Sequence, residues 1–142
     1  MASRTVRSKA QHRGPGLAAS RPKAGCRVSG RLWVERDGET FLSWGRVVLL
    51  ERIRDHGSIS AAARSMKMGY RHAWELVESM NSSSPKPLLR TQTGGARGGG
   101  AELTPEGEAA IAGWWALVAR FSEWMAGEEP RLWRTVEGAA GP

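Results

Sequence analysis

The order of apolar and polar residues predicts two short consecutive helices in the middle of the chain. The first runs from about Ser43 to Gly57, a residue that suits the left-handed backbone at a helix end. Its helical spacing is set by Arg46, Leu49, Leu50 and Ile53. Ser58 or Ser60 then accepts a hydrogen bond from an unpaired backbone N–H and starts the second helix, which continues to about Met66.

A third helix follows directly, because residues 67–69 form a turn and apolar residues then recur on one face. This apolar face comprises Tyr70, Ala73, Trp74, Val77 and Met80, and the opposite face carries Arg71, His72, Glu75 and Glu78. At this spacing, we expect both Tyr70 and Trp74 to lie in the core. The serines and prolines of residues 82–87 end the helix.

Two β-hairpins flank these helices in the sequence. Residues 31–36 and 39–42 are separated by Asp37-Gly38, a dipeptide that favours a tight hairpin turn. Residues 88–93 and 101–103 flank the glycine-rich segment 94–100, which contains Arg97. We therefore expect a leading hairpin before the three helices and a basic, glycine-rich hairpin after them.

The last predicted element is a long helix from about Pro105 to Ala126. Thr104 is its expected N-cap, followed by a proline at the first position and by Glu106 at the positive end of the helix dipole. Apolar residues follow the 3-4-3-4 spacing of a coiled-coil seam, at Ile111, Trp114, Val118, Phe121 and Met125. We interpret this stripe as a dimerisation face.

Together these elements predict an α+β, mainly α fold, a winged helix-turn-helix with a leading β-hairpin and a long C-terminal dimerisation helix. In this architecture the second helix of the pair enters the major groove of double-stranded DNA, which is about 12 Å wide and displays an unambiguous pattern of donors and acceptors. The glycine-rich hairpin is the wing, where backbone can pass close to phosphates.

The charge of the chain changes this picture in one respect. The net charge is +7, but residues 1–28 contain seven basic side chains and no acid, so the whole excess lies in that segment. We expect a disordered basic arm over 1–28, which either adds nonspecific DNA affinity or has no specific role. Residues 29–126 form the predicted DNA-binding domain and 127–142 a tail. Within 59–98, six basic residues face two acidic ones, which favours contact with phosphates.

Other classes of function find little support. Cys26 is the single cysteine, so an internal disulfide is excluded, and no Cys or His cluster suits a metal. His12, His56 and His72 occupy the arm, a helix end and an exposed face, and no nucleophile stands beside a base. No apolar run approaches the roughly 20 residues that cross a bilayer. We expect no enzyme, no cofactor, no membrane contact and a cytoplasmic protein, nucleoid-associated when bound to DNA.

Segments 57–63, 68–74 and 94–107 closely resemble the N-terminal domain of the ModE-type, molybdate-responsive bacterial regulators, and more loosely the helix-turn-helix of LysR-type regulators. The resemblance covers about residues 31–126. It implies a homodimer joined through the long helix and the leading strands, with two recognition helices in successive major grooves. Gly69 departs from the serine that commonly caps the third helix. The chain ends where the family's molybdate-binding domains would begin, so molybdate binding is not expected in it.

The sequence and the resemblance together select a set of candidate DNA contacts on the helix-turn-helix and the wing. They are Ser60, Arg64, Gly69, Tyr70, Arg71, His72, Glu75, Arg90, Thr93 and Arg97. Arg71 is placed to read a guanine edge or to hold a phosphate, and the sequence does not separate these roles. The predicted function is a homodimeric, sequence-specific transcription regulator. The alternative is a winged-helix protein-interaction module that uses the tryptophan-rich last helix and has no specific operator.

Overall fold

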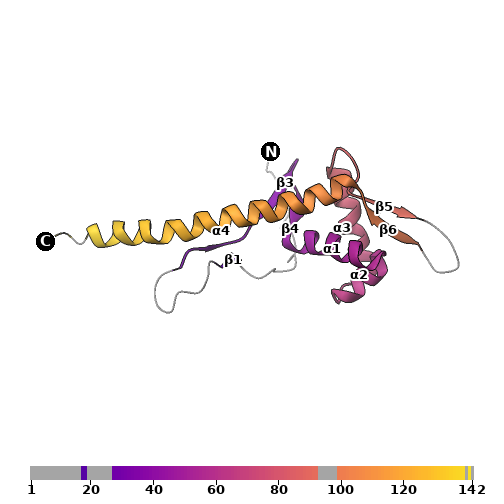
Figure 1. The fold of residues 1–142 in the computed structure, drawn as a ribbon, viewed down its shortest axis with the longest axis horizontal. Helices are drawn as coiled ribbons and strands as arrows, with labels where there is room; N and C mark the ends of the chain where they lie inside the picture. The colour runs from indigo at the N-terminus through magenta and orange to yellow at the C-terminus, as the bar shows by residue number, and fades with distance from the viewer. Residues whose placement is uncertain (1–16, 19–26, 93–98, 140, 142) are drawn as a thin grey trace, which may run out of the picture.

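The computed structural model describes residues 17–18, 27–92, 99–139 and 141. Its elements are β1 (Leu17–Ala18), β2 (Ser29–Gly30), β3 (Trp33–Arg36), β4 (Glu39–Ser43), α1 (Trp44–His56), α2 (Ile59–Ser65), α3 (Tyr70–Ser83), β5 (Leu89–Gln92), β6 (Gly100–Leu103) and α4 (Pro105–Ala139). The strands pair antiparallel as β1–β2, β3–β4 and β5–β6. In Figure 1, α1–α3 and the β5–β6 hairpin gather at one end of the long helix α4. The α+β, mainly α winged helix-turn-helix expected from the sequence is confirmed.

The leading hairpin turns where the sequence predicted. Asp37 and Gly38 have φ angles of 53° and 81°, the left-handed values that a two-residue hairpin loop requires. β3 and β4 pair with a register shift between Val34 and Glu35. Leu42 of β4 is buried and joins the core, so the hairpin is fixed to the helices at its second strand.

The hydrophobic core lies where the three short helices meet the first half of α4. α1 supplies four fully buried side chains, and it ends at Gly57, whose φ of 73° and hydrogen bond to the Ile53 carbonyl complete the predicted helix end. The buried apolar residues of α1, α3 and α4 in this core are Val47, Leu49, Leu50, Ile53, Ala73, Val77, Met80, Ile111, Trp114 and Val118.

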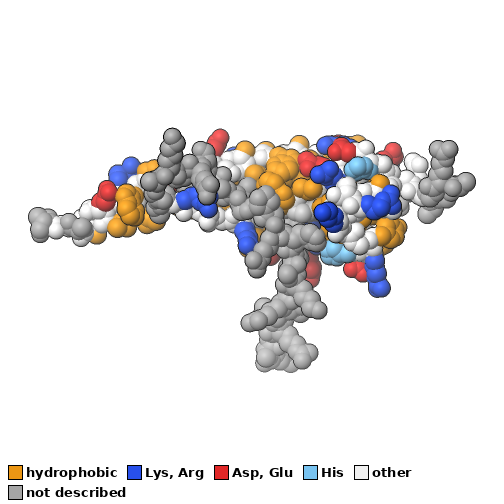
Figure 2. All heavy atoms as spheres, turned by 90° about the horizontal axis from the view of Figure 1, so that it is seen from below, with side chains coloured by type: hydrophobic (Ala, Val, Ile, Leu, Met, Phe, Trp, Pro, Cys, Tyr) orange, Lys and Arg blue, Asp and Glu red, His pale blue; other side chains and the backbone are white. Residues whose placement is uncertain are grey.

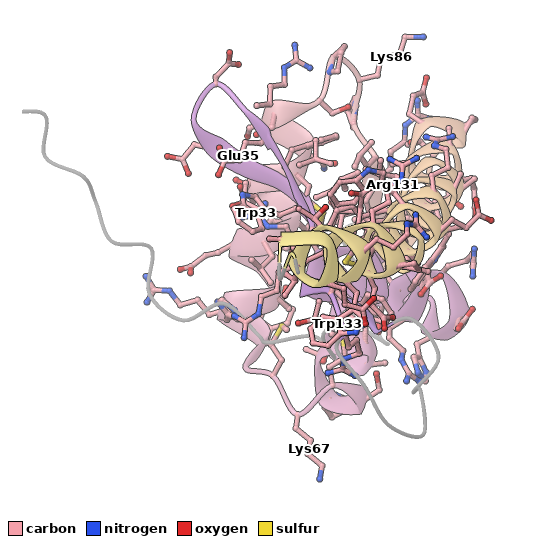
Figure 3. All side chains as sticks on the ribbon, turned by 90° about the vertical axis from the view of Figure 1, so that its left-hand side faces the viewer. Trp33, Glu35, Lys67, Lys86, Arg131 and Trp133 are labelled. Atoms are coloured by element: carbon pink, nitrogen blue, oxygen red, sulfur yellow. The ribbon has the colours of Figure 1, made fainter. Side chains whose placement is uncertain are left out.

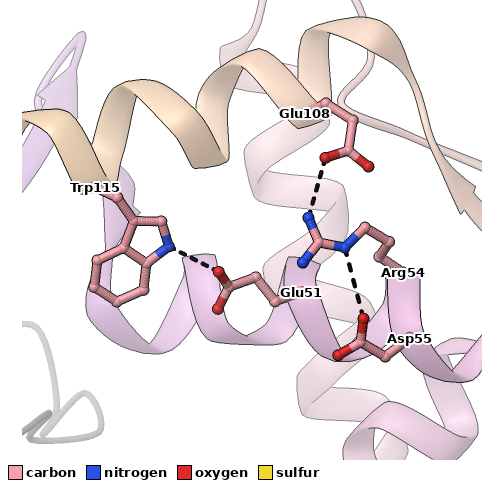
Figure 4. A network of polar contacts seen from close by, with 5 residues as sticks. All are labelled: Glu51, Arg54, Asp55, Glu108 and Trp115. Carbon is pink, nitrogen blue, oxygen red and sulfur yellow. Dashed lines mark hydrogen bonds and ion pairs between the residues drawn. The ribbon is translucent and has the colours of Figure 1, made fainter.

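Polar contacts also join α1 to α4 along the edge of this core (Figure 4). The Trp115 indole Nε1 donates to Glu51 Oε1 at 2.7 Å, and its ring packs edge-on against Trp44 with centroids 4.9 Å apart. Arg54 donates to Glu108 at 3.1 Å, and this bond raises the pKa of the Arg54 guanidinium. The start of α4 is therefore fixed to α1 by side chains as well as by packing.

α4 continues to Ala139, well beyond the end at Ala126 that the sequence analysis expected, and residues 127–139 are helix rather than a weakly patterned tail. Gly127 follows the expected end, but it does not adopt a positive φ and the helix continues through it. Pro130 lies inside the helix, where its missing N–H removes one backbone bond without ending the element. At about 1.5 Å per residue, α4 is about 50 Å long.

The predicted basic arm is mostly outside the described residues, which exclude 1–16 and 19–26. Leu17–Ala18 differ from the expected disorder, because they form β1 and pair with β2. β2 in turn lies against α4: a methyl group on Gly30 would be 3.2 Å from the Phe121 ring and 3.5 Å from the Met125 sulfur. This contact helps to bury Met125.

Candidate nucleic-acid interface

The helix-turn-helix forms from local signals at each helix end. Ser58, rather than Ser60, caps α2, and its Oγ accepts a hydrogen bond from the Ala61 N–H at 3.1 Å. Lys67 has a φ of 52°, and this left-handed residue turns the chain between α2 and α3. Gly69 occupies the N-cap of α3 without a side-chain cap, as its lack of a hydroxyl dictates.

α3 has one buried and one exposed face, which is the property that a recognition helix needs. Ala73, Val77 and Met80 are buried, as predicted, whereas Trp74 is half-buried against the core. The expectation that Tyr70 is a core residue is wrong, because its side chain is 56% exposed at the start of the helix. Tyr70 sits in the first turn, where the underlying core does not reach.

Arg71 and Glu75 share the exposed face of α3, one turn apart. The Nε of Arg71 donates to Glu75 Oε1 at 3.1 Å, with 92% and 59% of the two side chains exposed. His72 is also exposed on the first turn. The sequence candidates Tyr70, Arg71, His72 and Glu75 therefore lie together on the solvent-facing first turns of α3.

α2 contributes two further candidates next to this surface. Arg64 donates from Nη1 to Ser60 Oγ at 2.9 Å, across one turn of the helix. The Arg64 side chain is exposed and Ser60 is half-buried. This bond holds the guanidinium of Arg64 along α2.

Lys67, in the turn between α2 and α3, is a basic residue beside the exposed face of α3 that was not among the sequence candidates. In Figure 3 it projects away from the body at the edge that carries the turn between α2 and α3, whereas Lys86 projects from the opposite edge. Lys86 instead pairs with Glu106 at 3.4 Å. Figure 2 shows blue Lys and Arg side chains gathered on the face that carries the helix-turn-helix. The left-handed turn position was the signal that could have identified Lys67.

The wing is the β5–β6 hairpin, whose strands pair from Leu89 with Leu103 to Gln92 with Gly100. Arg90 is exposed on β5 and lies opposite Glu102 in the register. The candidates Thr93 and Arg97 fall outside the described residues. The wing is also joined to the helix-turn-helix, because the Ala101 N–H donates to the Gly57 carbonyl at 2.8 Å.

Two polar side chains fix the wing to the helices: Asn81, which was not among the sequence candidates, and Thr104, which was predicted only as the N-cap of α4. Asn81 of α3 accepts hydrogen bonds from the N–H groups of Leu88 and Leu89, at 2.9 and 3.2 Å, and donates to the Leu89 carbonyl at 3.0 Å. Thr104 caps α4 through the Gly107 N–H at 3.1 Å and donates to the Pro87 carbonyl at 2.6 Å. The position of the wing therefore depends on the end of α3 and the start of α4.

A buried arginine fixes α3 to α1. Arg46 is 7% exposed, and its Nη1 donates to Ser79 Oγ of α3 at 3.0 Å. Burial lowers the pKa of the Arg46 guanidinium, and the nearby negative charge of Glu39 partly opposes this shift. Since Glu39 begins β4, Arg46 of α1 interacts both with α3, through Ser79, and with the leading hairpin, through Glu39. From its spacing alone, Arg46 was expected on the helical stripe of α1 and was not assigned this role.

Most of the predicted dimerisation stripe is buried within its own chain. Ile111, Trp114 and Val118 lie in the core of their own chain, and Met125 is 1% exposed. Phe121 is half-buried and stacks on Trp124 with centroids 6.0 Å apart. The large apolar residues that α4 exposes are instead Trp124, Leu132, Trp133 and Val136. Figure 3 shows Trp133 pointing away from the axis of α4 near its C-terminal end.

The described part of the chain contains no group of three or more His, Cys, Asp or Glu side chains arranged to hold a metal ion. No helix among the described residues is long and apolar enough to span a membrane.

Known proteins resemble this chain over part of its length. It is 38% identical over 95 residues to the molybdenum transport protein ModE of Azotobacter vinelandii, covering 67% of the chain and 35% of that protein. It is 47% identical over 68 residues to the transcriptional regulator ModE of Haemophilus influenzae, covering 48% and 27%. It is 42% identical over 87 residues to the molybdenum-pterin-binding protein MopB of Rhodobacter capsulatus, covering 61% and 32%.

The chain thus spans about a third of the length of these relatives. The resemblance to ModE-type regulators that the sequence motifs indicated is confirmed. No family model matches the chain. Among solved structures, a crystal structure of a MarR family transcription regulator aligns with a TM-score of 0.42 and 22% identity, covering 69% of this chain and 68% of that one.

Proposed function

We propose that this chain is a DNA-binding transcription regulator that inserts α3 into the major groove of double-stranded DNA. One observation carries the proposal: the exposed first turns of α3 present Tyr70, Arg71 and Glu75, while the same helix is packed on its other face through Ala73 and Val77. A helix so arranged can enter a groove without disturbing the core. The names of the similar proteins, transcriptional regulators among them, support this function over an enzyme.

The basic side chains around α3 fit the roles of phosphate contacts. Arg64 on α2 and Lys67 in the turn flank the start of the recognition helix, and Arg90 lies on the wing. Cations at the border of a groove contact the phosphate backbone and position the protein without reading sequence. Ser60 adds a hydroxyl donor on the same side of α2. Thr93 and Arg97, which follow β5 in the sequence, stay candidates.

We further propose that the regulator acts as a homodimer joined through the distal part of α4. Ile111, Val118, Met125 and Leu132 follow one another at intervals of seven residues. The first three are buried within the chain, whereas Leu132 is 51% exposed, and Trp133 and Val136 extend its apolar surface. A second copy would bring the same surface to an isologous interface and cover it. This differs from the interface expected from the sequence, which included the buried residues.

DNA binding is tested with the full chain and a fluorescent duplex from the region upstream of its own gene. We expect a shift in fluorescence anisotropy whose affinity falls steeply as salt rises, because phosphate contacts release counterions. Lys67→Ala should weaken binding to all duplexes and reduce the slope of log affinity against log salt by about one. Lys86→Ala, on the opposite edge, is the matched control and should leave binding unchanged.

Two results would reject the proposal. The first is no salt-sensitive binding to any duplex. The second is equal losses from Lys67→Ala and Lys86→Ala, which would mean that the helix-turn-helix edge is not the contact surface. If DNA binding is absent but the distal surface of α4 still associates with other proteins, the protein-interaction module becomes the better interpretation.

A further inference from the structure

The exposed face of α3 contains an ion pair whose atomic geometry bears on the role of Arg71. The hydrogen bond of 3.1 Å joins Arg71 Nε to Glu75 Oε1 and engages neither terminal amino group of the guanidinium. Arginine presents its five N–H groups as a rigid planar fork. With Nε directed along the helix toward Glu75, the two terminal amino groups form the leading edge of the side chain.

We infer that Arg71 reads a guanine in the major groove and that Glu75 is the residue that positions it. The inference rests on the proposed function and deepens it. Guanine presents its O6 and N7 acceptors side by side, and the paired terminal amino groups of an arginine match them with two parallel hydrogen bonds. Glu75 restricts rotation of the long side chain before DNA arrives, so less freedom is lost on binding.

The carboxylate also disfavours the competing role of Arg71 as a phosphate contact. Glu75 is bonded directly to the guanidinium, so a phosphate bound by Arg71 would bring a second negative charge close to that carboxylate. Like charges at this separation repel, and the repulsion opposes binding. A guanine edge is neutral and presents acceptors alone, so it completes the fork without this penalty. Arg64 instead hydrogen-bonds to the Ser60 hydroxyl, and Lys67 projects away from the body. Neither contact brings a carboxylate close to the cation, so these two residues suit phosphate contacts better than Arg71 does.

The experiment begins with selection of bound duplexes from a random library by the full wild-type chain. Affinities are then measured for the selected duplex and for duplexes in which each guanine pair is replaced. At one guanine we expect wild-type discrimination of about 5- to 150-fold, as for a single bidentate contact. Arg71→Ala should abolish the discrimination at that position, and Arg71→Lys should reduce it several-fold, since lysine keeps the charge and donors but lacks the planar fork.

Glu75→Gln separates positioning from charge. We expect it to reduce discrimination at the same guanine several-fold while binding to unrelated duplexes is equal or tighter, because a repulsive charge has been removed. Arg71→Ala should leave the slope of log affinity against log salt unchanged, whereas loss of a phosphate contact lowers it by about one. Both side chains are exposed, so thermal unfolding should be unaffected and serves as the folding control.

Several outcomes would overturn the inference. If Arg71→Ala weakens all duplexes equally and lowers the salt slope, Arg71 holds a phosphate. If Glu75→Gln leaves discrimination at the guanine intact, Glu75 does not position it. If the wild-type chain selects a sequence whose every preference survives in Arg71→Ala, the inference fails while the proposed function stands. If the wild-type chain binds no duplex, the proposed function fails first and this inference with it.

Discussion

The two halves of α4 carry the same apolar spacing but have different surroundings. In the first half, Ile111 and Trp114 are buried against the three short helices, and Met125, just past the midpoint, is covered with help from β2. In the second half, Leu132 and Trp133 are each about half exposed. A heptad spacing therefore identifies a face that needs covering, but the tertiary structure decides whether the same chain or a partner covers it.

The largest expected effect follows from the buried half. Trp114→Ala should lower the free energy of unfolding by about 3–5 kcal/mol, because it leaves a large cavity at a residue that is 1% exposed. Trp133→Ala, the matched control in the distal half, should change it by less than about 0.5 kcal/mol when the chain is dilute enough to be monomeric. Urea unfolding followed by circular dichroism measures both. Similar losses for the two variants would contradict the difference between the halves.

The distal half should respond in self-association instead. Leu132→Asp places a charge at the proposed interface and should weaken dimerisation at least about tenfold. Arg134→Ala, on another side of the same helix turn, should leave it unchanged. Sedimentation velocity over a range of protein concentrations measures the association constant. A wild-type chain that stays monomeric at every concentration would show that a second copy does not cover this surface.

Much of the fold could be predicted because its signals are local. Asp37-Gly38 and Gly57 adopt the left-handed conformations that their residue types allow, and Thr104 caps α4 as its hydroxyl suggests. The end of α4 could not be predicted in the same way. Gly127 and Pro130 usually disfavour a helix, by about 1 and about 3 kcal/mol relative to alanine, yet α4 continues through both. Helix ends that lack a cap leave little trace in a sequence.

The site was predictable where it depends on helical spacing and not where it depends on contacts between distant segments. Arg71 and Glu75 were placed on the exposed face of α3 by their positions alone. Tyr70 was assigned to the core because its spacing matched, but the core does not extend to the first turn. Asn81 bonds to Leu89 on a β-strand of the wing, and Arg46 bonds to Ser79 on another helix, and neither partner is revealed by the helical spacing.

An effect of intermediate size on stability is expected from alanine substitutions at two glycines of α4, one on its covered side and one on its open side. A Cβ at Gly107 would lie against the Leu88 carbonyl, too close for van der Waals contact, whereas one at Gly113 would meet no atom within 4 Å. Gly107→Ala should therefore destabilise the fold by about 1–3 kcal/mol through backbone displacement. Gly113→Ala should stabilise it by about 0.5–1 kcal/mol, since alanine is the better helix former. Losses of equal size in thermal unfolding would contradict the close approach of α4 to Leu88.

The smallest expected effect concerns charge at the two ends of α4. A hydrogen bond from its own backbone N–H, together with Lys86, lowers the pKa of Glu106 below its ordinary value. Because the folded-state pKa is lowered, the stabilisation is present above the unfolded value of about 4.3 and is lost as the pH falls through the folded value.

Glu106→Gln should therefore lower the melting temperature slightly at pH 7, and the difference from wild type should disappear near pH 2. Glu137→Gln, in the last turn, should raise the melting temperature at pH 7, because an acid there faces the negative end of the helix dipole. Differential scanning calorimetry at both pH values measures these shifts. A lower melting temperature for both variants at pH 7 would contradict an electrostatic difference between the two ends of α4. The contacts of the first turn, rather than the helix dipole, would then account for the stabilising effect of Glu106.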